Sequence, residues 1–233
     1  MIRYKFAFED GSEMEFEADE NGDASSEEYL ESLPGWLALD RFCCDHCAVE
    51  PDSRRACPAA LSIRPLIEAF GRRVSHENVL VTVLVNDVKM EAVTSLQNGV
   101  RSLGGLLLAL SACPTMMKLR PMARFHLPFG DMDQTVFRAV GMYLTAQHLR
   151  QVKGLTPDWS LDGLKDVYGE VHRVNEKLAD RIRAASQADA TVNSLIILDS
   201  LGHIVELRIK KNLEKLVPLF AAYLEDGETP PAE

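Results

Sequence analysis

Residues 2–17 read IRYKFAFEDGSEMEFE, and this stretch decides the fold of the N-terminal part of the chain. Apolar and polar residues alternate on both sides of Asp10-Gly11. Such alternation is typical of strands with one buried face, and Asp-Gly between two alternating runs is a strong hairpin signal. We therefore expect a β-hairpin over residues 2–17.

A second hairpin is expected further along the chain, more buried than the first. Residues 78–85 and 88–93 are rich in β-branched and apolar residues, and Asn86-Asp87 separates the two runs as a turn. Between the hairpins, residues 19–32 are acidic and rich in Ser, which indicates a surface loop. Pro58 then begins a helix that Gly71 ends.

After the second hairpin the pattern becomes helical. Apolar residues recur at steps of three and four, and from Leu161 to Ile182 they follow a heptad spacing in which Asn175 is the polar exception. Ser160 is a plausible N-cap of that helix. The expected helices cover residues 95–112, 131–153, 160–182, 188–208 and 212–224, and residues 114–128 form an irregular basic segment.

These signals predict an α+β protein: a small N-terminal part with two β-hairpins and a cysteine metal knuckle, followed by an α-helical bundle. The expected organisation is an α+β metal-knuckle part over residues 1–93, a helical bundle over 94–225 and a disordered tail over 226–233. The tail contains two prolines and acidic residues, a composition that does not build a core.

Four of the five cysteines have the pattern of a metal site. Cys44 and Cys47 form a C-x-x-C knuckle, Cys57 follows in a Cys-Pro pair, and Cys113 comes much later in a second Cys-Pro pair. Four thiolates satisfy a tetrahedral ion, and a knuckle usually supplies the first two. If Cys113 joins the other three, the ion links the N-terminal part to the helices.

Structural zinc is the leading interpretation of these cysteines. Zinc binding supplies folding free energy to a segment that has few large apolar residues, as residues 34–57 do. A [4Fe-4S] cluster uses the same four thiolates and is the alternative cofactor. Cys43 lies beside the knuckle and His46 lies inside it, and both are alternative ligands. Unligated or redox-active thiols are the third interpretation.

The basic segment suggests a possible anion site. Arg120, Arg124 and His126 lie close together in the sequence, where they could bind a phosphate or a carboxylate beside the metal. The simpler interpretation is a loop that packs its apolar residues and pairs its basic residues with the acidic N-terminal region. Asp199 and His203, one helical turn apart, are a weaker candidate for a second metal centre, and a hydrogen-bond network is the simpler explanation there.

Composition narrows the classes of protein further. The chain is 46% apolar and 26% charged, as in ordinary globular proteins, and no apolar run approaches the length of a membrane span. No secretion signal is recognisable, so we expect a cytoplasmic protein in a reducing environment, where clustered cysteines favour metal over disulfides. The net charge is −10, concentrated in residues 1–31, which makes nucleic-acid binding unlikely.

The chain resembles an uncharacterised bacterial family, a domain of unknown function. The resemblance rests on Cys44-x-x-Cys47, on Cys57-Pro58, on Ser111-Ala112-Cys113-Pro114 and on the run MARFHLPF over residues 122–129. It extends over most of the chain and implies a soluble bacterial protein. The family brings no established activity, substrate or catalytic residue.

The sequence therefore predicts a protein that acts by binding or assembly around a structural metal site. Its partner is an unknown protein or a small anionic ligand. The motifs of phosphate-binding loops, zinc proteases and serine hydrolases do not occur. Two alternatives stay open: an enzyme that binds an anionic substrate at residues 118–128 beside a metal or cluster, and a thiol redox sensor that uses Cys43.

Overall fold

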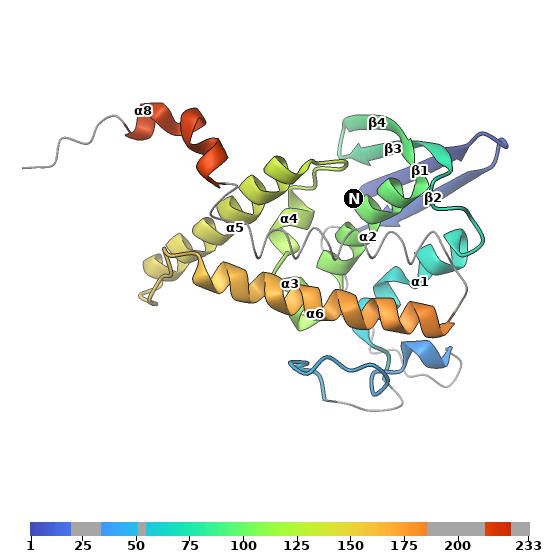
Figure 1. The fold of residues 1–233 in the computed structure, drawn as a ribbon, viewed down its shortest axis with the longest axis horizontal. Helices are drawn as coiled ribbons and strands as arrows, with labels where there is room; N and C mark the ends of the chain where they lie inside the picture. Colours follow the sequence, from blue (N-terminus) through green and yellow to red (C-terminus); the bar gives the residue numbers. More distant parts are fainter. Residues whose placement is uncertain (20–33, 51–54, 186–212, 225–233) are drawn as a thin grey trace, which may run out of the picture.

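The computed structural model describes residues 1–19, 34–50, 55–185 and 213–224, and it has an α+β architecture (Figure 1). An antiparallel four-stranded sheet near the N-terminus is followed by helices. The strands are β1 (Ile2–Phe8), β2 (Glu13–Ala18), β3 (Asn78–Val85) and β4 (Val88–Ser95). The helices are η2 (Gly35–Leu37), α1 (Pro58–Phe70), α2 (Leu96–Leu110), α3 (Pro114–Met117), α4 (Arg120–Arg124), α5 (Met132–Val152), α6 (Asp162–Ala185), η3 (Val217–Phe220) and α8 (Ala221–Leu224).

Both expected hairpins are confirmed, and they join edge to edge into one sheet. The strand order is β2-β1-β3-β4, so the first strand of each hairpin lies in the middle, and Phe6 is the partner of Val81 across the β1–β3 junction. Gly11 has a φ of +82° in the first turn, a conformation that glycine adopts without strain. The second hairpin is not the more buried one as a whole, because β4 is an edge strand and Val93 is 76% exposed.

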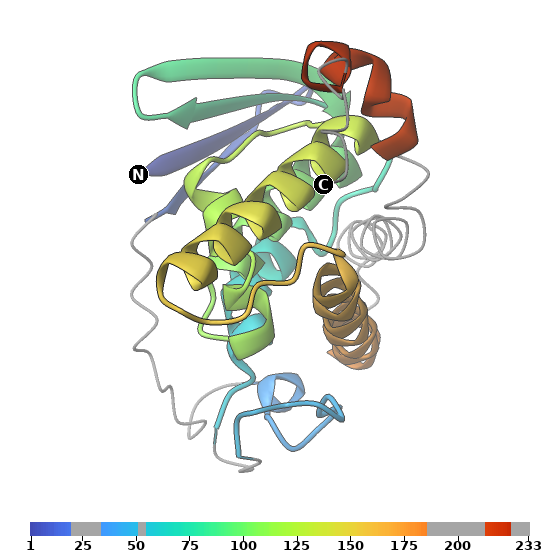
Figure 2. The same cartoon turned by 90° about the vertical axis from the view of Figure 1, so that its left-hand side faces the viewer.

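One face of the sheet carries the core, and the helices cover it (Figure 2). Alternate residues of β1 are buried, as the period-2 pattern requires, and Phe6 packs against Phe70 of α1 with ring centroids 4.9 Å apart. Gly99 of α2 lies directly over the sheet: a Cβ at this position would be 2.7 Å from Phe6 and 2.9 Å from Val81. The absence of a side chain at Gly99 is what lets α2 approach the strands this closely.

Helix α6 extends this core away from the sheet. Its buried residues Val171, Val174, Leu178 and Ile182 belong to the same cluster as the residues of β1, α1 and α2. The core thus draws on both sides of residue 93, where the sequence suggested a boundary between two parts. The expected division into residues 1–93 and 94–225 stays a prediction.

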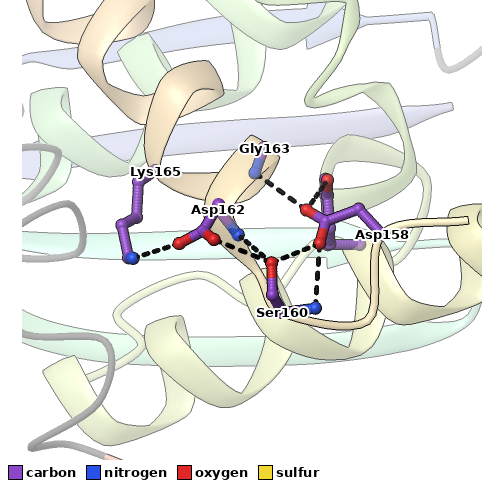
Figure 3. A network of polar contacts seen from close by, with 6 residues as sticks. Asp158, Ser160, Asp162, Gly163 and Lys165 are labelled. Carbon is purple, nitrogen blue, oxygen red and sulfur yellow. Dashed lines mark hydrogen bonds and ion pairs between the residues drawn. The ribbon is translucent and has the colours of Figure 1, made fainter.

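Helices α5 and α6 are joined by a turn that is organised by side-chain hydrogen bonds. At the far end of α5 from this turn, Asp131 caps the helix in a capping box with Gln134, as the start of the expected helix at 131 requires. At the start of α6, the Asp158 carboxylate accepts hydrogen bonds from the backbone N–H groups of Ser160 and Gly163, both at 2.8 Å (Figure 3). Asp158 therefore does more of the capping than Ser160, the residue that the sequence suggested.

One further expectation is wrong, and several lie outside the residues that the structure describes. The basic segment 114–128 is not irregular, because it contains the short helices α3 and α4. The loop over residues 20–32, the helix at 188–208 with Asp199 and His203, and the tail at 226–233 lie outside the described residues. Within the part of the chain that the structure describes, none of the helices combines the length and the apolar character that crossing a membrane requires.

Candidate metal centre

All five cysteines line one small cavity between the N-terminal segment and α6. They come from three places in the chain: Cys43, Cys44 and Cys47 from the knuckle, Cys57 from the start of α1, and Cys113 from the start of α3. The cavity has a volume of about 20 Å³. A volume of about 10–15 Å³ by this measure accommodates a single water molecule, so the space between the cysteines is the size of one small ion.

The backbone places these thiols by ordinary local structure. In the knuckle, the N–H of Cys47 donates to the carbonyl of Cys44 at 3.0 Å, which closes the turn. Cys57 and Cys113 are the N-cap residues of α1 and α3, and in each case the following proline occupies the first helical turn, where its missing N–H costs nothing. The two Cys-Pro pairs of the sequence are thus helix starts that direct their cysteines toward the knuckle.

The cysteines share a cavity but do not form a finished coordination shell. All five are free thiols. Among the residues that the structure describes, no group of three or more His, Cys, Asp or Glu side chains is arranged so that it could hold a metal ion. The four ligands predicted from the sequence therefore gather in one place, while metal binding itself stays a prediction.

Burial raises the pKa of three of these thiols, those of Cys43, Cys44 and Cys113, which keeps them protonated at neutral pH. Burial, followed by the neighbouring Cys57, Cys113 and Cys47, raises the pKa of Cys44 to about 12. Burial is also the first cause that raises the pKa of Cys43 and of Cys113. A metal ion at this position would have to displace thiol protons, so its affinity would depend steeply on pH.

Arg181 of α6 ties the cysteine segment to the helices. This residue is only 1% exposed, and its guanidinium donates to the backbone carbonyls of Trp36 at 2.9 Å, of Ala38 at 2.6 Å and of Leu39 at 3.2 Å. No carboxylate among the described residues forms an ion pair with Arg181, which also lines the cysteine cavity. Sequence reasoning missed this residue, because it flanks the heptad seam like any surface arginine and its partners are backbone atoms distant in sequence.

His46, the alternative ligand inside the knuckle, is not among the residues that line the cavity. Its Nδ1 accepts a hydrogen bond from Nε of Arg173 at 3.2 Å, so its ring faces α6. Burial, and secondarily the charge of Arg173, lowers the pKa of His46. Cys43, in contrast, does line the cavity, and after burial the neighbouring Cys47 is the next cause that raises its pKa.

The three residues of the possible anion site are not brought together in one cavity. Arg124 is exposed, and Nε and Nη2 of Arg120 are buried without a hydrogen-bond partner in the described part of the chain. His126 lines a second, larger cavity, and its Nε2 is hydrogen-bonded to the hydroxyl of Tyr4. An anion site formed by all three side chains stays a prediction that this arrangement does not favour.

Comparison with known proteins places the chain in a family without adding an activity. The chain belongs to DUF6901, a domain of unknown function, and the match covers residues 2–221. Nothing among curated proteins or solved structures matches it. The family resemblance seen in the sequence is thereby confirmed, and the chemistry has to be argued from the site itself.

Proposed function

We propose that this protein is a non-enzymatic cytoplasmic protein that binds one structural zinc ion and acts through binding or assembly with a partner. The ligands in this proposal are Cys44, Cys47, Cys57 and Cys113. The observation that carries it is the convergence of thiols from three separate segments on one ion-sized cavity. Unligated core cysteines have no reason to gather in this way, whereas a tetrahedral ion requires it.

The size of the cavity favours zinc over an iron–sulfur cluster. A [4Fe-4S] cluster contains eight heavy atoms, and a space of about 20 Å³ leaves room for only one. Zinc would draw the thiols that line this space to about 2.3 Å from a single ion, the distance at which thiolates bind it. The brown colour of a cluster in the purified protein would reverse this preference.

The charge balance supports the same proposal. Four thiolates around Zn²⁺ carry a net charge of −2, and the buried guanidinium of Arg181 lies at the same cavity without an ion-pair partner among the described residues. A buried cation is stabilised by an opposite charge nearby. Bound zinc would thus complete an electrostatic arrangement in which Arg181 already binds the backbone carbonyls of Trp36, Ala38 and Leu39, just before the knuckle.

The direct test is elemental analysis of protein purified under reducing conditions, before and after reconstitution with zinc. The expected result is one zinc ion per chain and loss of zinc in the Cys113→Ser variant, with a lower melting temperature. Cys43→Ser is the matched control, because Cys43 lines the cavity but is not a proposed ligand. The proposal fails if the reconstituted protein holds no stoichiometric metal, or if Cys113→Ser retains zinc as well as Cys43→Ser does.

A thiol switch is the second candidate, because Cys43 and Cys47 line the same cavity of about 20 Å³. Mild oxidation could join such a pair in a disulfide. Mass spectrometry after peroxide treatment of the zinc-free protein would show a Cys43–Cys47 cross-link. If these cysteines resist oxidation while zinc binds, the structural role alone remains.

A further inference from the structure

A second cavity, of about 180 Å³, lies along α6 nearer to the start of this helix than the cysteine cavity does. It is partly open to solvent and is lined by α2, by α3 and α4 with the segment that follows them, by the start of α5 and by α6. Its walls are largely apolar and include leucine and methionine side chains as well as Phe129. For comparison, an apolar protein cavity of about 150 Å³ binds benzene, so this one has room for a small organic molecule.

Two arginines at this cavity have no acidic partner among the described residues. Arg101 forms no ion pair within the part of the chain that the structure describes, and burial alone lowers the pKa of its guanidinium. Arg138 donates from Nη2 to the backbone carbonyls of Met122 and Phe125, both at 2.7 Å, and burial is again the main reason that its pKa is lowered. Partly buried guanidinium groups of this kind are stabilised by a carboxylate or phosphate, which they bind with two hydrogen bonds.

Helix α6 adds polar groups whose hydrogen bonds are missing or weak. Asn175 is only 3% exposed, lines the cavity, and its Oδ1 has no hydrogen-bond partner among the described residues. Tyr168, 5% exposed, donates to the sulfur of Met122 at 3.6 Å, and sulfur is a weak acceptor. Buried polar atoms without partners are costly, so an unpaired amide at an apolar cavity indicates a ligand that supplies the missing hydrogen bond.

We propose that this cavity binds a small monocarboxylic acid with an apolar body of roughly five to eight carbon atoms. The carboxylate pairs with Arg101 and Arg138, the apolar body fills the leucine- and methionine-lined space, and a hydroxyl or amide group on the body donates to Asn175. A second negative charge would be unfavourable, because the remaining walls are mostly apolar and contribute only neutral polar groups such as the hydroxyls of Ser102 and Thr135. This site is independent of the cysteines and goes beyond the proposed structural role.

The test is a binding panel on the full chain, measured by calorimetry and by the shift in melting temperature. The acids are acetate, hexanoate, benzoate, phenylacetate and 4-hydroxyphenylacetate, and 2-phenylethanol is the neutral counterpart of phenylacetate. We expect the six- to eight-carbon acids to bind, 4-hydroxyphenylacetate to bind more tightly than phenylacetate, and acetate and 2-phenylethanol to bind at least about tenfold more weakly. The proposal is overturned if no acid of the panel binds, or if the neutral alcohol binds as well as the acids.

Variants separate the cavity from nonspecific attraction of anions. Arg101→Met and Arg138→Met should each weaken binding about tenfold or more, while Arg64→Met, which removes an arginine from an exposed ion pair with Glu68, should leave it unchanged. Ala123→Leu should fill the cavity and abolish binding. Equal loss in Arg64→Met, or undiminished binding in Ala123→Leu with its fold intact by circular dichroism, contradicts the site.

The free protein supplies a second readout. Because Arg101 has no ion-pair partner in the described structure, Arg101→Met without ligand should melt at the same temperature as the wild type or higher. A clearly lower melting temperature would show that Arg101 has a structural role instead. Bound phenylacetate should raise the melting temperature of the wild type but not that of Arg101→Met.

Discussion

Replacing Arg181 by Met tests how the cysteine segment is held on the helices. The guanidinium of Arg181 donates to three backbone carbonyls of residues 36–39, and Met retains most of the chain length without any donor. The substitution therefore removes the hydrogen bonds while keeping most of the packing. We expect the segment that carries the knuckle to loosen from α6.

The expected loss of stability follows from the carbonyls that the variant leaves behind. The carbonyl of Ala38 also accepts from the N–H of Arg41 at 3.3 Å, so it loses least. The carbonyls of Trp36 and Leu39 have no other donor among the described residues, and a buried acceptor without a partner costs about 1–3 kcal/mol. Removing a buried charge recovers part of this, which gives a net loss of roughly 3 kcal/mol in the free energy of unfolding.

The assay combines urea unfolding with the rate at which a thiol reagent labels Cys44, both measured with a metal chelator present. The control is Arg183→Met, because Arg183 is 54% exposed and pairs with Asp180, and exposed pairs contribute about 0–1 kcal/mol. Labelling of Cys44 should accelerate in Arg181→Met and not in the control. The reasoning is refuted if Arg181→Met unfolds within about 1 kcal/mol of the wild type with unchanged labelling.

Two further substitutions test the packing of α2 on the sheet and the buried histidine. Gly99→Ala should lower the free energy of unfolding by roughly 1–2 kcal/mol, because the new Cβ would lie less than 3.0 Å from Phe6 and Val81. This strain exceeds the gain of about 1 kcal/mol in helix propensity that alanine brings. Calorimetric melting of the variant and the wild type measures the difference. His126→Asn tests acid sensitivity: burial lowers the pKa of His126 from 6.5 to about 4, so the unfolded chain takes up a proton first as pH falls through this window. The stability that depends on neutral His126 is fully present above pH 6.5 and is lost as the pH falls toward 4. The loss in the free energy of unfolding amounts to up to about 3 kcal/mol. Urea unfolding across these pH values should show a smaller loss in His126→Asn.

Both Gly99→Ala and His126→Asn have a control that can contradict the reasoning. Gly141 lies in α5, and apart from its chain neighbours and the helix's own backbone nothing lies within 4 Å of the position that a Cβ would occupy there, so Gly141→Ala should stabilise the protein by up to about 1 kcal/mol. If Gly99→Ala and Gly141→Ala change the melting temperature in the same direction, the close contact at Gly99 does not restrict this position. If wild type and His126→Asn lose stability equally between pH 6.5 and pH 4, His126 is not held neutral by burial.

Much of the local structure could be predicted because its causes lie within a few residues. The Asp10-Gly11 turn with its alternating flanks defined the first hairpin, and Pro58 and Asp131 marked the starts of α1 and α5. The candidate metal site was predictable to the same degree. The spacing of Cys44 and Cys47 and the two Cys-Pro pairs identified the thiols that the structure places at one cavity.

The strands, the helix starts and the candidate thiols can therefore be read from the chain, because each is encoded by near neighbours. Only the folded molecule shows that β1 pairs with β3 to join the hairpins, and that Arg181 reaches the carbonyls of residues 36–39. It alone also placed Asn175 at an apolar cavity with two arginines. The physical reason is that backbone carbonyls and the hydrogen-bonding edges of strands are chemically the same at every position in the chain. A partner distant in the chain is therefore selected by packing and not by any local sequence pattern.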